Sequence, residues 1–246
     1  MRDRYQVQLA YDGTAFHGSQ IQPELRTVQG EVEQALRKLK WQGSPVLFAG
    51  RTDAGVHAAG QVIALDLEWD HTEKELNQAL NAVLPQDISA VRINRTRYDF
   101  HPRYDALSRE YHYQILSSSI RDPLRERYVW RVWPEVDVQL MKKASKNLVG
   151  SHDFAALGNP HQPGGSTVRN ISRAAWKQKG DLLVFEVVGN AFLYHMIRRI
   201  VMLLVKIGQR KEEPETLKNY LLNPSGPPSQ GLAPASGLSL VEVRYK

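Results

Sequence analysis

The sequence predicts an α+β fold that contains two ferredoxin-like units, each with the element order β-α-β-β-α-β. Two observations predict it. Segments of alternating apolar residues, typical of strands, and segments of helical periodicity follow one another in this order, and the order occurs twice. The chain has 246 residues, of which 42% are hydrophobic. This is enough to bury the core of one large domain or of two small ones.

The first half contains four predicted strands and two predicted helices. The strands are residues 5–11, 46–49, 63–67 and 88–94, and the helices are residues 28–39 and 73–83. Thr27 is placed to cap the first helix. Thr72 and Glu75 form a capping box at the start of the second helix, and Pro85 ends it.

The second half repeats this order. Its strands are residues 111–115, 170–177, 182–188 and 238–245, and its helices are residues 138–148 and 193–207. We therefore predict two domains, an N-terminal half of residues 1–104 and a C-terminal half of residues 105–246. Two stretches rich in Gly, Pro and Ser, residues 158–166 and 223–236, are predicted loops that either contact a ligand or cover the surface passively.

Composition limits the classes of partner and chemistry. The net charge of +6 and the pI near 9.5 favour a polyanion such as nucleic acid, because Lys and Arg release counterions from phosphates. The lack of cysteine excludes disulfides and thiolate nucleophiles, and the eight histidines form no metal-binding motif. No apolar run is long enough to span a bilayer and no apolar signal segment follows Met1, so we expect a cytoplasmic protein.

A glycine- and alanine-rich segment, residues 50–60, contains the first candidate chemistry. It holds Arg51, Asp53 and His57 among small residues that let a partner approach closely. An aspartate beside glycine most often caps a turn, and local composition alone favours that structural interpretation of Asp53.

The surroundings of Arg198 give a reason to consider a functional role for Asp53. The helix around it is apolar on nearly every face, which predicts that the helix is buried. A buried guanidinium needs an anionic partner because it cannot lose its charge, and the candidates are Asp53, Glu186 and an RNA phosphate. The competing interpretation is that Arg198 lies at the helix start and extends to water.

Aromatic and basic residues alternate in two further segments, residues 100–104 and 109–113. This combination, with Arg103 as an example, suits base stacking together with phosphate neutralisation. Tyr111 and Tyr113 share one face of a predicted strand, and burial in the core is the commoner outcome for such a pair.

Motifs spread over nearly the whole chain carry a resemblance to one family. The central motif is Gly50-Arg51-Thr52-Asp53-Ala54-Gly55-Val56-His57-Ala58, followed by Gly60-Gln61-Val62. The others are Tyr11-Asp12-Gly13 with Gly18 and Gln20, Thr27-Val28-Gln29, Phe100-His101 with Arg103, Tyr111 with Tyr113, Asn190-Ala191-Phe192 with His195-Met196 and Arg198, and Ala233-Pro234-Ala235 with Gly237-Leu238 and Leu240. In composition and order they resemble the TruA-type tRNA pseudouridine synthases. The chain departs from the family at Ser19, where the family usually has tryptophan.

The resemblance implies isomerisation of uridine to pseudouridine at positions 38, 39 and 40 of the tRNA anticodon stem-loop, without a cofactor or a required metal. It implies Asp53 as the catalytic carboxylate, Arg198 as its basic partner and Tyr111 as the active-site tyrosine. The predicted substrate-binding residues are Arg51, His57, Arg103 and Tyr111. The resemblance also implies a homodimer and the pseudouridine synthase fold, in which the strands of both halves join in one mixed, mainly antiparallel sheet with helices packed on it.

Two alternative functions stay open. A non-catalytic RNA-binding protein shares the element order of the RNA-recognition motif, but the third strand here, residues 61–67, lacks the exposed aromatic residues of that motif. A nuclease usually needs several carboxylates around a divalent metal, and Asp53 has no acidic neighbour in its loop. The sequence also contains no P-loop or G-x-G-x-x-G motif for a nucleotide cofactor.

Overall fold

Two structural units make up the computed structural model, which describes residues 3–246. The first unit is residues 3–107 together with Ser239–Lys246, and the second is Ser108–Leu238. Each unit combines mostly antiparallel strands, one parallel pair and packed helices, so the predicted α+β class with a mixed sheet is confirmed. Within the described residues, no helix is both long enough and apolar enough to cross a membrane.

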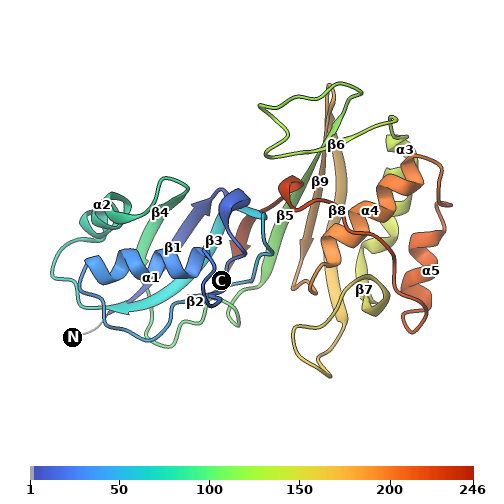
Figure 1. Cartoon of the computed structure of the whole chain (residues 1–246). Helices are drawn as coiled ribbons and strands as arrows, with labels where there is room; N and C mark the ends of the chain where they lie inside the picture. The colour runs from blue at the N-terminus through green and yellow to red at the C-terminus, as the bar shows by residue number, and fades with distance from the viewer. Residues whose placement is uncertain (1–2) are drawn as a thin grey trace. The chain divides into compact units, whose positions relative to one another are not determined.

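The first unit has the predicted β-α-β-β-α-β order (Figure 1). Its elements are β1 (Asp3–Tyr11), α1 (Val28–Lys38), β2 (Leu47–Phe48), β3 (His57–Leu67), α2 (Glu73–Val83) and β4 (Ile88–Arg95). The strands lie in the order β4-β1-β3-β2, and each neighbouring pair is antiparallel. This is the strand order of a ferredoxin-like unit.

Capping and amphipathic patterning explain the two helices of this unit. The Thr27 hydroxyl accepts a hydrogen bond from the Gly30 N–H at the start of α1. At the start of α2, Thr72 and Glu75 form the predicted capping box. Both helices bury their apolar stripes, and α2, whose Leu76 and Leu80 are buried, packs on β4.

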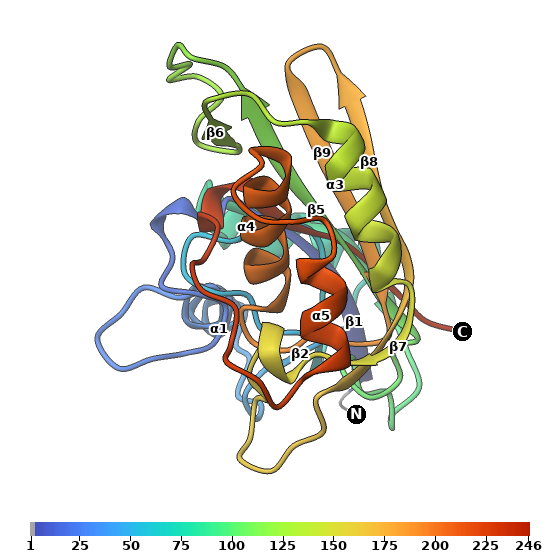
Figure 2. The ribbon, with the colours of Figure 1, turned by 90° about the vertical axis from the view of Figure 1, so that its right-hand side faces the viewer.

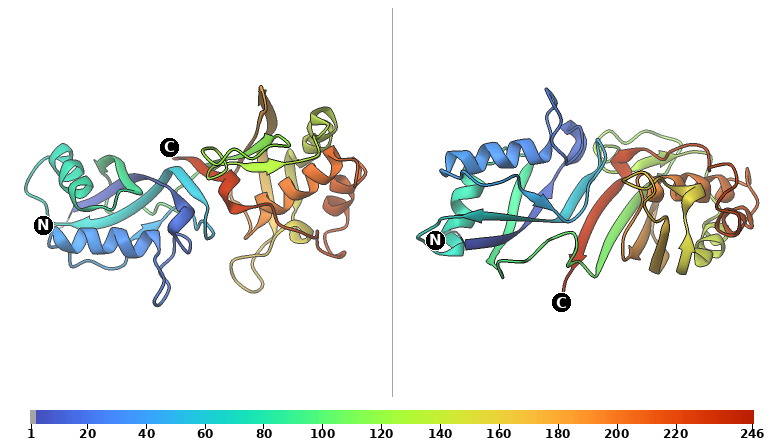
Figure 3. Two further views of the ribbon diagram at one scale, coloured as in Figure 1. Left: turned by 45° about the horizontal axis from the view of Figure 1, so that its top comes forward. Right: turned by 90° about the horizontal axis from the view of Figure 1, so that it is seen from below.

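Strand β3 is hydrogen-bonded along both of its edges. One edge pairs with β1, and the other pairs with β2 through Ile63 and Ala64. The start of that second edge pairs in parallel with β10 (Leu238–Arg244) through His57 and Ala58 (Figure 3). Gly60 permits this approach, because a Cβ there would lie 2.1 Å from the Val241 carbonyl oxygen. Residues 239–246 therefore group with the first unit, whereas the division predicted from sequence was 1–104 and 105–246.

The second unit is a sheet covered on one face by helices (Figure 2). Its elements are β5 (Ser108–Ser117), β6 (Trp130–Val132), α3 (Val138–Ser145), β7 (Gly150–Asp153), β8 (Val168–Lys179), β9 (Leu182–Gly189), α4 (Met196–Gly208) and α5 (Thr216–Leu222). The strands lie in the order β5-β9-β8-β7, all antiparallel, and β6 pairs in parallel with the end of β5. The described chain also has four 3-10 turns, η1 (Gly13–Ala15), η2 (Lys146–Leu148), η3 (Ala155–Leu157) and η4 (Ala235–Gly237).

Helix α4 forms the apolar centre of the second unit and packs against α3 and α5. Most of its side chains are buried, as its nearly uniform apolar sequence predicts. It begins at Met196 and not at Leu193, because His195 has a φ of 65°, outside the helical range. Tyr111 and Tyr113 of β5 are also buried, as expected for an alternating aromatic pair.

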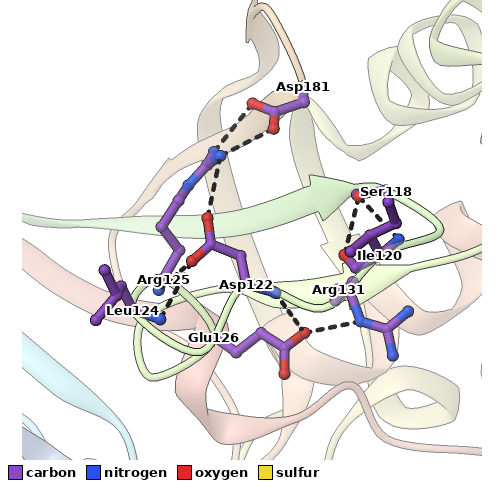
Figure 4. Close-up of polar contacts among 8 residues, drawn as sticks. All are labelled: Ser118, Ile120, Asp122, Leu124, Arg125, Glu126, Arg131 and Asp181. Atoms are coloured by element: carbon purple, nitrogen blue, oxygen red, sulfur yellow. Dashed lines mark hydrogen bonds and ion pairs between the residues drawn. The ribbon is translucent and has the colours of Figure 1, made fainter.

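The connection between β5 and β6 is fixed by ion pairs (Figure 4). Arg125 donates two hydrogen bonds to Asp181 in the β8–β9 turn and lies 3.8 Å from Asp122. Glu126 accepts a hydrogen bond from Arg131, which belongs to β6. The two predicted loops of this unit also lie outside helices and strands for most of their length, and residues 158–166 are mostly exposed, as their composition predicts.

The capping box of α2 provides a test of this fold. Replacing Thr72 with Ala removes the acceptor for the Glu75 N–H, so the free energy of unfolding should fall by about 1 kcal/mol in urea denaturation. Thr216→Ala is the matched control, because Thr216 begins α5 and the described structure shows no capping hydrogen bond from a side chain there. Equal effects of the two substitutions would contradict the assignment.

Candidate active site

The loop between β2 and β3 carries Asp53 at the entry to β3. Asp53 begins a tight turn, in which its carbonyl oxygen accepts a hydrogen bond from the Val56 N–H at 3.1 Å, and Gly55 has a φ of 76°. The turn that local composition predicts is therefore present in the main chain. The side chain of Asp53 is half-buried and that of Arg51 is exposed, so both are accessible from solvent.

His57 lies beneath this loop at the first position of β3. It is 7% exposed, and its Nδ1 accepts a hydrogen bond from the Gly13 N–H at 3.0 Å and lies 3.2 Å from Asp12 Oδ1. The segment after β1 is in close contact here, since a Cβ on Gly13 would lie 2.0 Å from the Val56 carbonyl oxygen. His57 thus connects the loop to the segment after β1, and its predicted contact with substrate stays a prediction.

Arg103 also belongs to the first unit and lies outside the Asp53 loop. Its side chain is exposed, and its guanidinium carbon is 5.8 Å from the centre of the Tyr104 ring. Tyr104 is itself 76% exposed, and its ring lies next to that of His101, with ring centres 4.2 Å apart and the planes tilted by 38°. This surface has the alternating basic and aromatic character that the sequence predicts for residues 100–104.

Tyr111 and Arg198 lie in the second unit. Tyr111 is buried on β5, and its ring contacts Phe192 edge-on at 5.2 Å. Arg198 is half-buried in the first turn of α4 and donates from Nε to the Ala233 carbonyl oxygen at 2.7 Å. The segment that leads from Phe192 into α4 therefore connects the two predicted catalytic residues. The predicted pairing of Arg198 with Asp53 joins residues of different units and stays a prediction.

Tyr113 lies beside Arg198 and belongs to the same hydrogen-bonded region. Its hydroxyl donates to the Pro234 carbonyl oxygen at 2.7 Å, next to the Ala233 carbonyl that Arg198 contacts. Burial raises the pKa of Tyr113, and the charge of Arg198 opposes this shift. Tyr113 is therefore a neutral donor that fixes residues 233–234 beside the start of α4.

Glu186, one of the sequence-predicted partners for Arg198, binds two cations of β8. It is 4% exposed, receives a hydrogen bond from Arg173, and lies 2.6 Å from the Lys177 Nζ. Burial opposes its ionisation, but Lys177 and Arg173 outweigh burial and hold the pKa of Glu186 below its usual value. Its carboxylate is thus used in a structural ion network.

Glu186 also belongs to a group of residues that are potential metal ligands. One ligand atom each of Glu110, His112 and Glu186 lie within 4.8 Å of one another. Arg173 and Lys177 already neutralise Glu186, which disfavours a cation at the same oxygens. The donor set therefore fits an ion network better than a metal site.

The pH dependence of stability tests this ion network. A lowered pKa means that ionised Glu186 stabilises the fold above its unfolded pKa and that this contribution is lost as pH falls through its folded pKa. Glu186→Gln should therefore lower the free energy of unfolding by about 1–2 kcal/mol at neutral pH and reduce its decline in acid, measured by urea titration from about pH 7 to about pH 3. Glu213→Gln at an exposed position is the control. An unchanged acid dependence would contradict the network.

Sequence reasoning did not identify the residues that hold the Asp53 loop. Gln61 donates from Nε2 to the Gly50 carbonyl oxygen at 2.9 Å, and Tyr11 and Ser19 both contact Thr52. Tyr11 and Gln61 belong to the motifs shared with the family, and Ser19 is the position that departs from it. Spacing along the chain does not reveal that these three residues contact the loop.

The chain is similar to known proteins over almost its whole length. It matches a family model described as tRNA pseudouridine synthase over residues 8–105 and 144–246. The tRNA pseudouridine synthase A of Fervidobacterium nodosum is 41% identical over 244 residues, which cover 98% of this chain and 99% of the relative. The tRNA pseudouridine synthase A of Thermotoga sp. strain RQ2 is 40% identical over 96% and 97% of the two chains. The tRNA pseudouridine synthase A 1 of Bacillus cereus strain ATCC 10987 is 38% identical over 99% of both.

Proposed function

Because the chain belongs to the tRNA pseudouridine synthase family, we propose that it isomerises uridine to pseudouridine at positions 38, 39 and 40 of the tRNA anticodon stem-loop, with Asp53 as the catalytic carboxylate. The enzyme is an isomerase whose substrate is tRNA. The observation that carries the assignment of Asp53 is its place in a loop where the carboxylate is accessible while the main chain on both sides is hydrogen-bonded.

The reaction needs no redox partner and no external group. The bond between ribose C1′ and uracil N1 breaks, the base turns, and a bond forms between C1′ and C5. The proton on C5 is lost, and N1 gains a proton. A carboxylate is suited to act here as a nucleophile or as a base, and Asp53 has this role in the proposal.

The target base must leave its stack before a carboxylate can reach the sugar. In the proposal, Arg51, which is exposed two residues before Asp53, holds the phosphate of the extruded nucleotide or fills the vacated space. His57 supports the same loop from beneath, and Arg103 adds a cation beside an exposed tyrosine for the RNA backbone.

Arg198 and Tyr111 complete the proposed active site. In the proposal, Arg198 pairs with the Asp53 carboxylate and orients it, because a guanidinium forms charge-assisted hydrogen bonds of fixed geometry with a carboxylate. Tyr111 stacks on the uracil and assists the proton transfer at C5. The proposal also includes a homodimer and a cytoplasmic location, where tRNA is available.

Removing the carboxylate tests the central assignment. Asp53→Asn should reduce tritium release from tRNA that carries uracil labelled at C5 to background, while the Kd for tRNA changes by less than about threefold. Asp70→Asn, at an exposed position outside the loop, should keep full activity. Turnover by Asp53→Asn would overturn the role of Asp53. The lack of release by the unaltered protein would overturn the proposed function.

Replacing the arginine tests the pairing. Arg198→Met should lower the single-turnover rate at least about a hundredfold, because the reaction loses a preorganised charge next to the carboxylate. Arg210→Met is the control, since Arg210 is 77% exposed and pairs with Asp137. A rate within about threefold of the unaltered enzyme would contradict the pairing of Arg198 with Asp53.

The alternative of a metal-dependent nuclease has its own test. Activity that survives EDTA and leaves the RNA intact would exclude a nuclease.

A further inference from the structure

Ser19 makes two hydrogen bonds to the residue that precedes Asp53. Its hydroxyl accepts a hydrogen bond from the Thr52 N–H at 2.8 Å, and its own N–H donates to the Thr52 carbonyl oxygen at 3.0 Å. Ser19 is 1% exposed, and Thr52 is 7% exposed. The two bonds therefore lie away from water, where a main-chain N–H without a partner is costly.

The side chain of Thr52 is held from a third direction. Its hydroxyl lies 2.8 Å from the Tyr11 hydroxyl, which also accepts a hydrogen bond from Gln61 Nε2 at 3.4 Å. Either hydroxyl can be the donor in the contact between Tyr11 and Thr52. Burial raises the pKa of Tyr11, so its phenol is protonated at neutral pH.

The same network reaches the residue before Arg51. Gln61 donates to the Gly50 carbonyl oxygen at 2.9 Å. Gly50 and Thr52 are therefore bonded to the body of the unit, while the alternate residues Arg51 and Asp53 are the accessible ones. The hydrogen bonds at Gly50 and Thr52 fix the main chain of the loop, and the charged side chains of Arg51 and Asp53 extend from this fixed main chain.

The approach of Ser19 depends on its neighbour. Gly18 has a φ of 93°, and a Cβ there would lie 2.9 Å from the Thr52 carbonyl oxygen. This conformation brings the Ser19 N–H to the carbonyl oxygen of Thr52 and the Ser19 hydroxyl to the N–H of Thr52. A side chain at position 19 without an acceptor on its γ atom cannot bind the Thr52 N–H as the serine hydroxyl does.

We propose that Ser19 is a positioning residue for the reaction: its hydroxyl fixes the main chain at Thr52 and thereby the direction of the Asp53 carboxylate. This inference rests on the proposed function, because it assumes that Asp53 reacts. Ser19 itself does not contact the substrate in this role. Its loss should therefore affect the chemical step and leave the affinity for tRNA largely unchanged.

The test compares Ser19→Ala with the unaltered enzyme under single-turnover conditions. We expect the rate constant for tritium release to fall about tenfold, because the Thr52 N–H loses its acceptor, while the Kd for tRNA stays within about twofold. Ser19→Cys keeps the shape of the side chain with a somewhat larger γ atom that is a poor acceptor, so its rate should lie between those of the unaltered enzyme and Ser19→Ala. The matched control is Ser118→Ala, which removes a hydroxyl that accepts the Ile120 N–H in the exposed loop of Figure 4.

All rates are measured at least about 20 °C below the melting temperature of each variant, where the fraction unfolded is negligible. If Ser19→Ala melts earlier but reacts at the unaltered rate, Ser19 is only structural and the proposal is overturned. If Ser19→Ala does not fold, Ser19→Cys decides by the same criterion. A lack of activity in the unaltered enzyme would instead overturn the proposed function, so the two failures are distinguishable.

Discussion

Main-chain hydrogen bonding on both edges of β3 is the constraint on which the Asp53 loop depends. β1 occupies one edge from Leu67 to Ala58, and β2 and β10 divide the other edge between them. A strand that is paired on both sides cannot shift its register without moving every apolar side chain to the wrong face. The first residue of β3, His57, is therefore fixed, and so is the end of the loop that precedes it.

Glu186 and Asp53 are carboxylates in different environments. Glu186 is buried and satisfied by two cations of the neighbouring strand, which makes it a structural group. Asp53 is half-buried at the end of a strand, in a loop whose main-chain groups have partners. A reactive carboxylate needs this second arrangement, because a substrate must reach its oxygens while its backbone stays still.

Long elements with local signals were predictable from sequence. The α2 bounds match because Thr72, Glu75 and Pro85 mark both ends within the sequence itself. β6, β7 and α5 were missed because three to seven residues are too short to show a period. The start of α4 was placed too early, since the positive φ of His195 depends on tertiary context.

The site was predictable only as far as side-chain chemistry reveals it. An arginine and a carboxylate among glycines mark the loop, but the contacts that hold it join its main chain and the Thr52 hydroxyl to polar side chains far away in the sequence. These side chains lie 33 residues away in the case of Ser19 and 41 in the case of Tyr11. Serine at position 19 looks like the loss of a large aromatic side chain when only the motif is considered. In the structure it supplies an acceptor to the residue before Asp53, so the departure from the family pattern adds a hydrogen bond to the loop that carries the chemistry.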